Sequence, residues 1–310
     1  MNYKYILAPL AGLTDKAFRR LCSEFGADLT FTEMISSDGL VHNFKKTSKL
    51  LEKYENESNV GVQLFGHKED LILESVKILN DFEFLILDFN VGCPVKKVFN
   101  SGSGAALLKD LKKLSHIMNI IKKNTKFPLS MKIRVGINEI DYNIVDYIIK
   151  VAEDLKLSFL TIHGRARKQM FSGKADWNVI KYAIDKAKIP IIGNGDIFTF
   201  KDAKEKMEKY KPAGIMIARG ALSNPFIFKE LKLDKELLIS NYEKLKTATR
   251  HFMYMLQYKD TNRAIKEMRK FWGWYSKGMK NSSSFRYTIF RLNSIADILS
   301  YVNEYIESIK

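Results

Sequence analysis

The first 231 residues alternate between short apolar segments and longer amphipathic ones. Each apolar segment has four to six residues, and many of these are β-branched, which is typical of buried β-strands. The longer segments repeat apolar residues at helical spacing and predict helices over 141–155, 177–187 and 200–210. The strands predicted are 5–9, 29–33, 60–65, 84–89, 129–134, 159–163, 190–193 and 214–218.

Eight strand–helix units of this kind predict an α/β fold, the (β/α)8 or TIM barrel. A doubly wound parallel sheet is the alternative, because the pattern does not prove that the sheet closes. The first predicted strand is not followed by GxGxxG, which weakens the dinucleotide-binding version of that alternative. The sequence contains no P-loop and no HExxH motif.

The pattern changes after Leu231, where helical spacing continues without strands. It predicts three helices, over 236–258, 263–279 and 285–309. We therefore expect a catalytic barrel over residues 1–231 and an all-helical C-terminal domain over 232–310.

The composition is that of a globular protein, with 46% hydrophobic and 28% charged residues. Two cysteines, Cys22 and Cys93, exclude a disulfide framework and an all-cysteine metal site, and we expect no metal. No apolar run approaches the roughly 18 residues of a membrane span, and the N-terminal segment is too quickly interrupted to be a secretory signal. We expect a cytoplasmic monomer with no membrane partner.

The charge indicates a polyanionic partner. The chain has 51 Lys and Arg against 35 Asp and Glu, a net charge of +16, and such an excess most often favours nucleic acid. Compositional drift is the alternative, because lysine is abundant throughout. However, residues 232–310 hold 15 basic and 8 acidic residues, whereas residues 1–231 hold 36 and 27. The C-terminal region is therefore the more basic per residue.

Polar and glycine residues converge at the predicted strand ends, where the active sites of such barrels lie. One of them alone is weak evidence, but a purely structural barrel needs no Gln, Lys, Arg and His at the same end of its strands. The candidates are Pro9, Leu10, Ala11, Gln63, Asn90, Cys93, Lys132, Arg134, His163, Asn194, Gly195, Asp196, Ala218, Arg219 and Gly220.

The last two strand ends predict a phosphate site. Gly195 and Gly220 would let backbone N–H groups approach an anion, and Arg219 adds a charged fork. The alternative is that both glycines serve tight turns with positive φ. We favour phosphate binding, because both turns occur at the two strand ends where barrels most often hold it.

Cys93 lies on a long connection after the fourth predicted strand, between Gly92 and Pro94. This length is compatible with a mobile lid, and nearby cations could lower the pKa of the thiol. No base arranged for acyl transfer is evident in the sequence, so a proton donor is as reasonable as a nucleophile. Cys22, by contrast, is expected to be a buried apolar filler.

Ordered motifs across the whole barrel closely resemble those of the tRNA-dihydrouridine synthases of the bacterial flavoprotein type. Any one of them is weak, but their combination is highly specific. The motifs are APLAGLTDKAFRRL (8–21), VQLFG (62–66), DFNVGCPVKKV (88–98), GSGAALL (102–108), MKIRVG (131–136), TIHGRAR (161–167), IIGNGDI (191–197) and MIARGALSNPFIF (216–228).

This resemblance implies an FMN-containing barrel that reduces selected uridines of the tRNA D-loop with NADPH. It implies flavin contacts through the backbone of Pro9, Leu10 and Ala11, through Gln63 and Lys132 at the polar ring edge, and through His163. It places the ribityl phosphate at Asn194, Gly195, Asp196, Ala218, Arg219 and Gly220. It makes Cys93 the general acid, and Asn90 and Arg134 substrate contacts.

The chemistry of uracil agrees with these roles. Reduction of its 5,6 double bond requires a hydride at C6, which N5 of the reduced flavin can supply, and a proton at C5, which Cys93 can supply. A cation such as Lys132 would stabilise the anionic reduced ring. A stacked uridine is out of reach, so the base must be flipped into the pocket.

Segment 269–291 interleaves cations with aromatic residues. For the aromatics we favour a helical core. For Lys277, Lys280 and Arg286 we favour contact with tRNA phosphates, because the charge density is high here. Two other functions remain open: a flavin barrel reductase acting on a small molecule, which leaves the basic region unexplained, and an RNA-binding or chaperone-like protein with a vestigial barrel.

Overall fold

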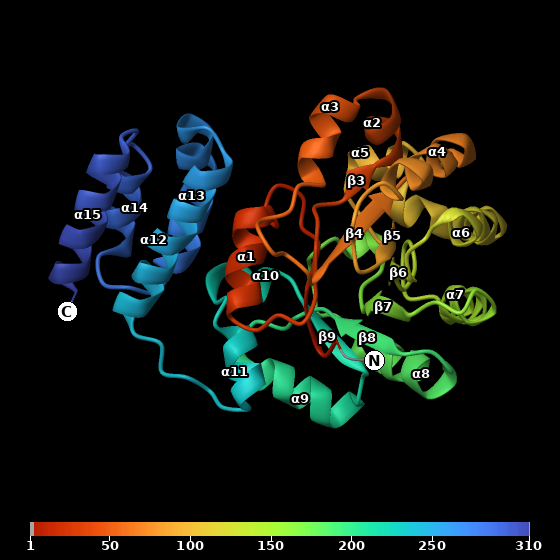
Figure 1. Cartoon of the computed structure of the whole chain (residues 1–310). Helices are drawn as coiled ribbons and strands as arrows, with labels where there is room; N and C mark the ends of the chain where they lie inside the picture. Colours follow the sequence, from red (N-terminus) through yellow and green to blue (C-terminus); the bar gives the residue numbers. More distant parts are fainter. Residues whose placement is uncertain (1–2, 310) are drawn as a thin grey trace.

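The computed structural model describes residues 3–309 and places a ring of parallel strands at the centre of the N-terminal region (Figure 1). The strand order is β1-β9-β8-β7-β6-β5-β4-β2, and a backbone bridge between Ile6 and Leu29 joins β1 to the start of β2. The predicted barrel is confirmed. Its strands are β1 (Tyr5–Leu7), β2 (Thr30–Phe31), β4 (Val60–Phe65), β5 (Leu87–Val91), β6 (Leu129–Arg134), β7 (Phe159–His163), β8 (Ile191–Asn194) and β9 (Gly214–Ile217).

Several strands differ from the prediction, and β1 and β2 are shorter than the predicted segments 5–9 and 29–33. A two-residue strand, β3 (Ile35–Ser36), pairs with the end of β4. The fourth predicted strand, 84–89, instead begins at Leu87 and continues to Val91. The Phe84 ring before it packs against the rings of Phe82 and Phe127. Asn90 consequently belongs to β5 itself, one residue from its end.

Helices cover the outside of the barrel (Figure 1). The three helices predicted for this region are found within one residue of their expected ends. The outer helices are α1 (Lys16–Glu24), α4 (Glu69–Leu79), α6 (Leu111–Asn124), α7 (Tyr142–Asp154), α8 (Trp177–Lys186), α9 (Phe200–Tyr210) and α11 (Ile227–Leu233). The connections hold shorter elements: α2 (Ser37–His42), α3 (Phe44–Thr47), η1 (Ser48–Leu50), α5 (Lys96–Asn100), η2 (Gly104–Lys109), η3 (Arg167–Gln169) and α10 (Arg219–Ser223).

The C-terminal region is helical as predicted, but with four helices: α12 (Asn241–Tyr258), α13 (Thr261–Tyr275), α14 (Ser282–Ile289) and α15 (Ile295–Ser308). The single helix predicted over 285–309 is wrong. Ser294 accepts the backbone N–H of Asp297 and so starts a new helix. The start predicted at residue 236 is also too early, because Ser240 and Glu243 form a capping box that begins α12 at Asn241.

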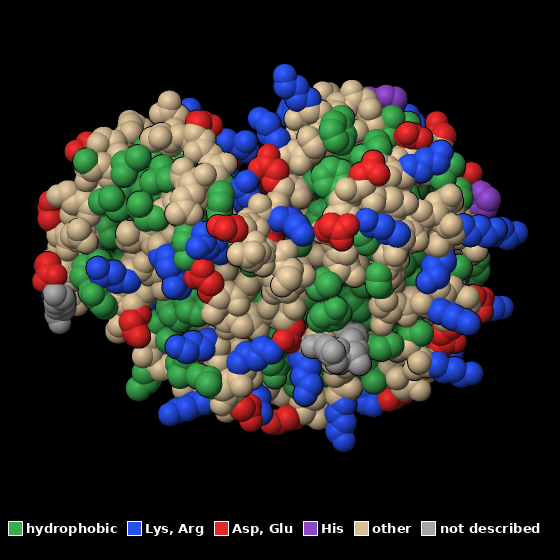
Figure 2. Space-filling model, viewed as in Figure 1, with side chains coloured by type: hydrophobic (Ala, Val, Ile, Leu, Met, Phe, Trp, Pro, Cys, Tyr) green, Lys and Arg blue, Asp and Glu red, His purple; other side chains and the backbone are tan. Residues whose placement is uncertain are grey.

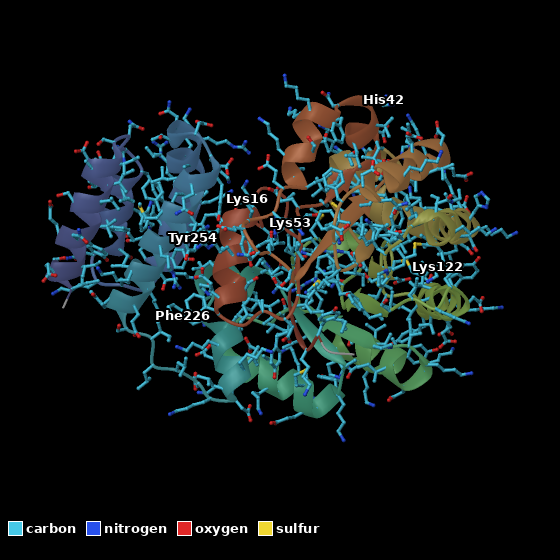
Figure 3. All side chains as sticks on the ribbon, in the orientation of Figure 1. Lys16, His42, Lys53, Lys122, Phe226 and Tyr254 are labelled. Atoms are coloured by element: carbon cyan, nitrogen blue, oxygen red, sulfur yellow. The ribbon has the colours of Figure 1, made fainter. Side chains whose placement is uncertain are left out.

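The C-terminal helices pack on α1 of the barrel (Figure 1). The Phe18 ring lies 5.3 Å from that of His251 and 5.4 Å from that of Phe271. Tyr254, which points toward α1 in Figure 3, donates a hydrogen bond to Glu24. The boundary predicted between residues 231 and 232 falls within α11. The division into two domains stays a prediction, and residues 1, 2 and 310 of those ranges lie outside the described part of the chain.

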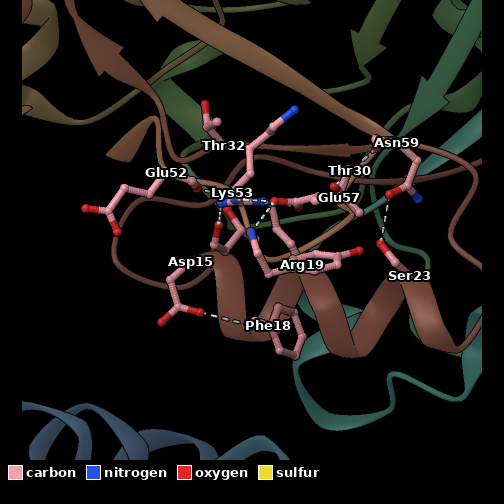
Figure 4. Close-up of polar contacts among 12 residues, drawn as sticks. Asp15, Phe18, Arg19, Ser23, Thr30, Thr32, Glu52, Lys53, Glu57 and Asn59 are labelled. Atoms are coloured by element: carbon pink, nitrogen blue, oxygen red, sulfur yellow. Dashed lines mark hydrogen bonds and ion pairs between the residues drawn. The ribbon is translucent and has the colours of Figure 1, made fainter. Parts of the chain in front are cut away.

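A buried ion pair fastens α1 to the connection before β4 (Figure 4). Arg19 donates to both carboxylate oxygens of Glu57, at 2.7 and 2.9 Å, and to the carbonyl of Glu52 at 2.9 Å. The Arg19 and Glu57 side chains are 2% and 0% exposed. A charge removed from water this completely is stabilised only while its partner stays in place.

We expect Glu57→Gln to lower the free energy of unfolding by about 3–5 kcal/mol, because it leaves the Arg19 charge buried without its counterion. Urea denaturation of the variant measures this loss. Lys16→Gln is the matched control: it breaks an ion pair in which Glu52 is half exposed, so we expect a loss below about 1 kcal/mol. Equal losses in the two variants would contradict the importance of the buried pair.

Candidate active site

A cavity of about 420 Å³ opens at the C-terminal ends of the strands. This is where a barrel of this type forms its site, and the volume lies within the range of small-molecule pockets. Most of the predicted residues face it: Pro9, Leu10, Ala11, Asn90, Cys93, Lys132, Arg134, His163, Asn194, Gly195, Asp196, Ala218 and Arg219. Gln63, Gly220, Lys277, Lys280 and Arg286 do not line it.

The cavity is strongly cationic. Lys132 donates to Asn194 Oδ1 at 3.0 Å, and burial lowers its pKa to about 8. Burial also lowers the pKa of Arg134, to about 10. The pKa of His163 lies well below its usual value because the ring is buried and lies near four cations. The imidazole is therefore neutral at pH 7. Because Lys132, Arg134 and Arg219 line the cavity, it favours an anionic or electron-rich ligand.

The Cys93 thiol belongs to a tight turn at the end of β5. The backbone N–H groups of Gly92 and Cys93 donate to Asn90 Oδ1, at 3.1 and 2.9 Å. Cys93 is 8% exposed, and burial raises its pKa above the ordinary 9.0, outweighing Lys132 and Arg134. The net shift is opposite to the lowering considered from the sequence, and the thiol stays protonated at neutral pH.

The connection after Cys93 is folded rather than an open lid. It contains α5 and η2, and residues 103–108 are buried. The backbone N–H of Ala105 donates to the Cys93 carbonyl at 3.2 Å. The long connection therefore packs against the turn that carries the thiol. Cys22 is fully buried on α1, which agrees with a filler.

The polar groups of two predicted site residues form hydrogen bonds within the protein. Gln63 is fully buried, and its amide bonds to Asp88 and Asn90. Arg134 donates to the carbonyls of Ala166 and Met170, at 3.0 and 2.7 Å. Arg134 thus faces the cavity while fixing the loop after β7.

The strand ends predicted to bind phosphate are held together by ion pairs. Both oxygens of Asp196 accept from Arg165 at 2.8 Å, and Arg219 lies 3.5 Å away. Asp196 therefore orients two arginines. Gly195 has φ +125°, whereas Gly220 does not adopt a positive φ: a Cβ there would lie 2.3 Å from the Ile197 carbonyl oxygen. The positive φ of the turn explains why residue 195 is glycine, and close packing against Ile197 explains why residue 220 is glycine.

Several cavity residues were not anticipated from the sequence. Phe171 and Phe198 are 51% and 43% exposed, and the Arg219 guanidinium lies 5.0 and 5.3 Å from their rings. Trp274 reaches the same cavity from α13. Arg165 stands in the HGRAR segment, but nothing in the sequence pairs it with Asp196. Helical spacing groups Trp274 with core aromatics, and only the packing of α13 on the barrel reveals its position.

The outer cations lie apart from this cavity. Lys277 and Lys280 are exposed, and within residues 3–309 neither forms an ion pair. Arg286 is half-buried and donates to the hydroxyls of Ser282 and Ser283 at 3.4 and 3.3 Å. The aromatic core expected beside them is present, with Phe271, Trp272, Tyr275 and Phe285 almost fully buried. Figure 2 shows further Lys and Arg side chains in the notch between the helices and the barrel.

No helix within residues 3–309 is long and apolar enough to cross a membrane. No group of three or more His, Cys, Asp or Glu side chains in the same range could hold a metal ion.

Solved structures with a similar fold are barrel proteins of low sequence identity. Histamine dehydrogenase from Rhizobium sp. 4-9 aligns with 80% of this chain and 49% of its own, with a TM-score of 0.57 and 12% identity. A 2-naphthoyl-CoA reductase aligns with 75% of this chain and 50% of its own, with a TM-score of 0.56 and 8% identity. These similarities support the fold.

Sequence relatives extend over nearly the whole chain. A probable tRNA-dihydrouridine synthase of Rickettsia bellii is 35% identical, over 100% of this chain and 96% of its own. The tRNA-dihydrouridine synthase B of Pasteurella multocida is 34% identical, over 96% and 90%. The family model described as dihydrouridine synthase (Dus) matches residues 6–310. The chain therefore belongs to the dihydrouridine synthase family.

Proposed function

We propose that this protein is a tRNA-dihydrouridine synthase: an FMN-dependent oxidoreductase that uses NADPH to reduce the 5,6 double bond of uridines in the tRNA D-loop. The observation that carries the proposal is the pairing of a protonated thiol with a cation in one cavity. Cys93, in the turn that follows β5, and Lys132, on the neighbouring strand β6, both face it. A proton donor and an anion-stabilising group are what reduction of uracil requires.

The residues of the cavity fit FMN. Its phosphate would lie by Arg219 and the backbone of 194–196 and 218–220, since the Asp196 carboxylate is already used by Arg165. Lys132 would lie at the polar edge of the ring, and the backbone of residues 9–11 would lie against its face. Bound FMN supplies the hydride once NADPH has reduced it.

The remaining chemistry belongs to side chains of this chain. Cys93 would give its thiol proton to C5 of uracil, and its raised pKa keeps that proton in place at neutral pH. Lys132, whose pKa is about 8, is largely charged at pH 7 and would offset negative charge in the cavity. Asn90 has an amide at the cavity wall and would orient the base. Gln63 lies behind that wall and accepts a hydrogen bond from Asn90, so it would act on the flavin ring or the uracil base by positioning Asn90.

The tRNA would approach from the mouth of the cavity, with the target base flipped out of its stack. Lys277 follows Trp274, which lines the cavity, by three residues, so at most about 11 Å of backbone separates the two residues. Cations there would meet phosphates near the flipped nucleotide. We retain the monomeric state and the cytoplasmic location as predictions.

This function can be tested by measuring separately the reduction of the flavin by NADPH and its reoxidation by tRNA. NADPH should bleach the flavin absorbance under anaerobic conditions, and unmodified tRNA should then restore it as dihydrouridine forms. Mapping of dihydrouridine at single-nucleotide resolution identifies the positions. Reoxidation by a small enone but not by tRNA would indicate a small-molecule reductase, and a protein without flavin would indicate an RNA-binding scaffold.

We expect acid or heat to release FMN quantitatively from the purified protein. We expect the strand ends at 194–196 and 218–220 to bind the single phosphate of FMN, and neither cysteine occurs in a covalent attachment motif. Chromatography of the released flavin against FMN and FAD standards measures this. Recovery of FAD, or of no flavin, would contradict the assignment of the strand ends at 194–196 and 218–220.

A further inference from the structure

A hydrogen-bonded carboxylate lies inside the barrel, behind the cavity wall. Asp88 is completely buried on β5, and it accepts from the Ser130 hydroxyl at 2.6 Å and from Gln63 Nε2 at 2.7 Å. Gln63 and Asp88 are register partners on neighbouring strands β4 and β5. The proposed reaction assigns Asp88 no role.

The same hydrogen-bonded chain continues to the turn that carries the thiol. Asn90 Nδ2 donates to Gln63 Oε1 at 2.8 Å, and Asn90 Oδ1 accepts the N–H groups of Gly92 and Cys93. Asp88 and Asn90 are two residues apart on one strand, so their side chains point to the same face. The chain thus runs from Asp88 through two amides to the backbone of Cys93.

The two ends of this chain permit only one arrangement of the amides. Burial raises the pKa of Asp88 to about 6, so its carboxyl group is mostly ionised at neutral pH. An ionised carboxylate only accepts hydrogen bonds, and a backbone N–H only donates. Gln63 must therefore present its NH₂ to Asp88 and its oxygen to Asn90. If the Gln63 amide were flipped, its oxygen would face the Asp88 carboxylate and its NH₂ group would face the NH₂ group of Asn90. Both contacts would be unfavourable, because all three side chains are buried.

We propose that Asp88 is a positioning residue, whose carboxylate fixes the orientation of the Gln63 and Asn90 amides and so holds the Cys93 turn in the cavity. This inference rests on the proposed function, because a fixed thiol matters through proton transfer to the substrate. The positioning itself is measurable on the protein alone, without flavin turnover or RNA.

The test uses the reactivity of the thiol. In a Cys22→Ala background of the full chain, Cys93 is the one cysteine that iodoacetamide can alkylate. Burial and a raised pKa make this reaction slow in the parent. A loosened turn exposes the thiol and brings its pKa down, so the labelling rate increases. Circular dichroism establishes that each variant is folded.

Four variants distinguish the orientation of the Gln63 and Asn90 amides from the packing of side chains at position 88. Asp88→Leu keeps the branched shape of the side chain, with a larger volume, but removes the acceptor. We expect labelling to become about fivefold faster or more, within the coupling range of contacting residues. Asp88→Asn can still accept from Gln63, so its rate should stay within about twofold of the parent. Gln63→Glu sets two buried carboxyl groups against each other. At an alkaline pH, where both are ionised, the labelling rate should also increase, whereas one shared proton would restore the donor to Asp88.

The double variant Asp88→Asn with Gln63→Glu should recover the slow rate. Asparagine then donates to one oxygen of glutamate, and Asn90 still donates to the other. Packing alone does not predict this rescue. Parent-like labelling in folded Asp88→Leu, or a double variant as reactive as Gln63→Glu at that alkaline pH, would overturn the proposal. Failure of the parent to form dihydrouridine in tRNA would contradict the proposed function and leave the labelling result standing.

Discussion

Cys93→Ala is expected to form dihydrouridine in tRNA about a hundredfold more slowly or worse, while NADPH reduces its flavin at a near-normal rate. The thiol faces the cavity and keeps its proton at neutral pH because burial raises its pKa. Alanine leaves the backbone of the turn and its bonds to Asn90 in place but has no proton to give. Stopped-flow flavin absorbance and single-turnover product analysis measure the two half-reactions separately.

Cys22→Ala is the matched control, since it removes the other thiol of the chain from a fully buried position on α1. It should retain turnover on tRNA. Full turnover in Cys93→Ala together with loss in Cys22→Ala would reverse the assignment. Because the Cys93 pKa lies above 9.0, its proton-transfer step should not titrate around neutral pH. It should weaken only in alkaline solution, where the thiol ionises.

Replacing Lys277, Lys280 and Arg286 together with glutamine should weaken tRNA binding and reduce its dependence on salt. Each lost phosphate contact lowers the slope of log affinity against log salt by about 0.7–0.9, so the loss is up to about three units. Lys277 and Lys280 are exposed and free of ion pairs within residues 3–309, whereas Arg286 already contacts two serines. We therefore expect the two lysines to account for most of the effect.

Lys112, Lys122 and Lys123 of α6 provide a control with the same loss of charge. They lie on the barrel side away from the C-terminal helices, where Figure 3 labels Lys122. Their replacement with glutamine should leave the salt slope nearly unchanged. Flavin content and reduction by NADPH should not change in either triple variant. Equal slopes for the parent and the Lys277, Lys280 and Arg286 variant would move the RNA-binding face elsewhere, toward the lysines that follow Cys93.

Strongly periodic segments were the most predictable part of the fold. The strands over 60–65, 129–134 and 159–163 have the predicted bounds, because nearly all of their residues are buried and apolar residues recur along each of them. Predicted helix ends were wrong where a capping serine starts a helix at a position that the apolar spacing does not mark. The cap at Ser294 divides the last predicted helix although the apolar spacing continues across it.

From the residues alone we predicted strand–helix units, a basic helical region and most of the residues at the cavity, whereas closure of the sheet into a barrel is seen in the structure. Strand ends can be read from a repeating apolar pattern, and parallel strands bring those ends to one face. Which side chains meet at that face depends on how the loops and the C-terminal helices pack. Arg165 pairs with Asp196 across two loops, Trp274 enters from a helix far along the chain, and burial gives Cys93 its high pKa. Hydrogen bonding and desolvation depend on distances in space, and periodicity along a chain carries no information about them.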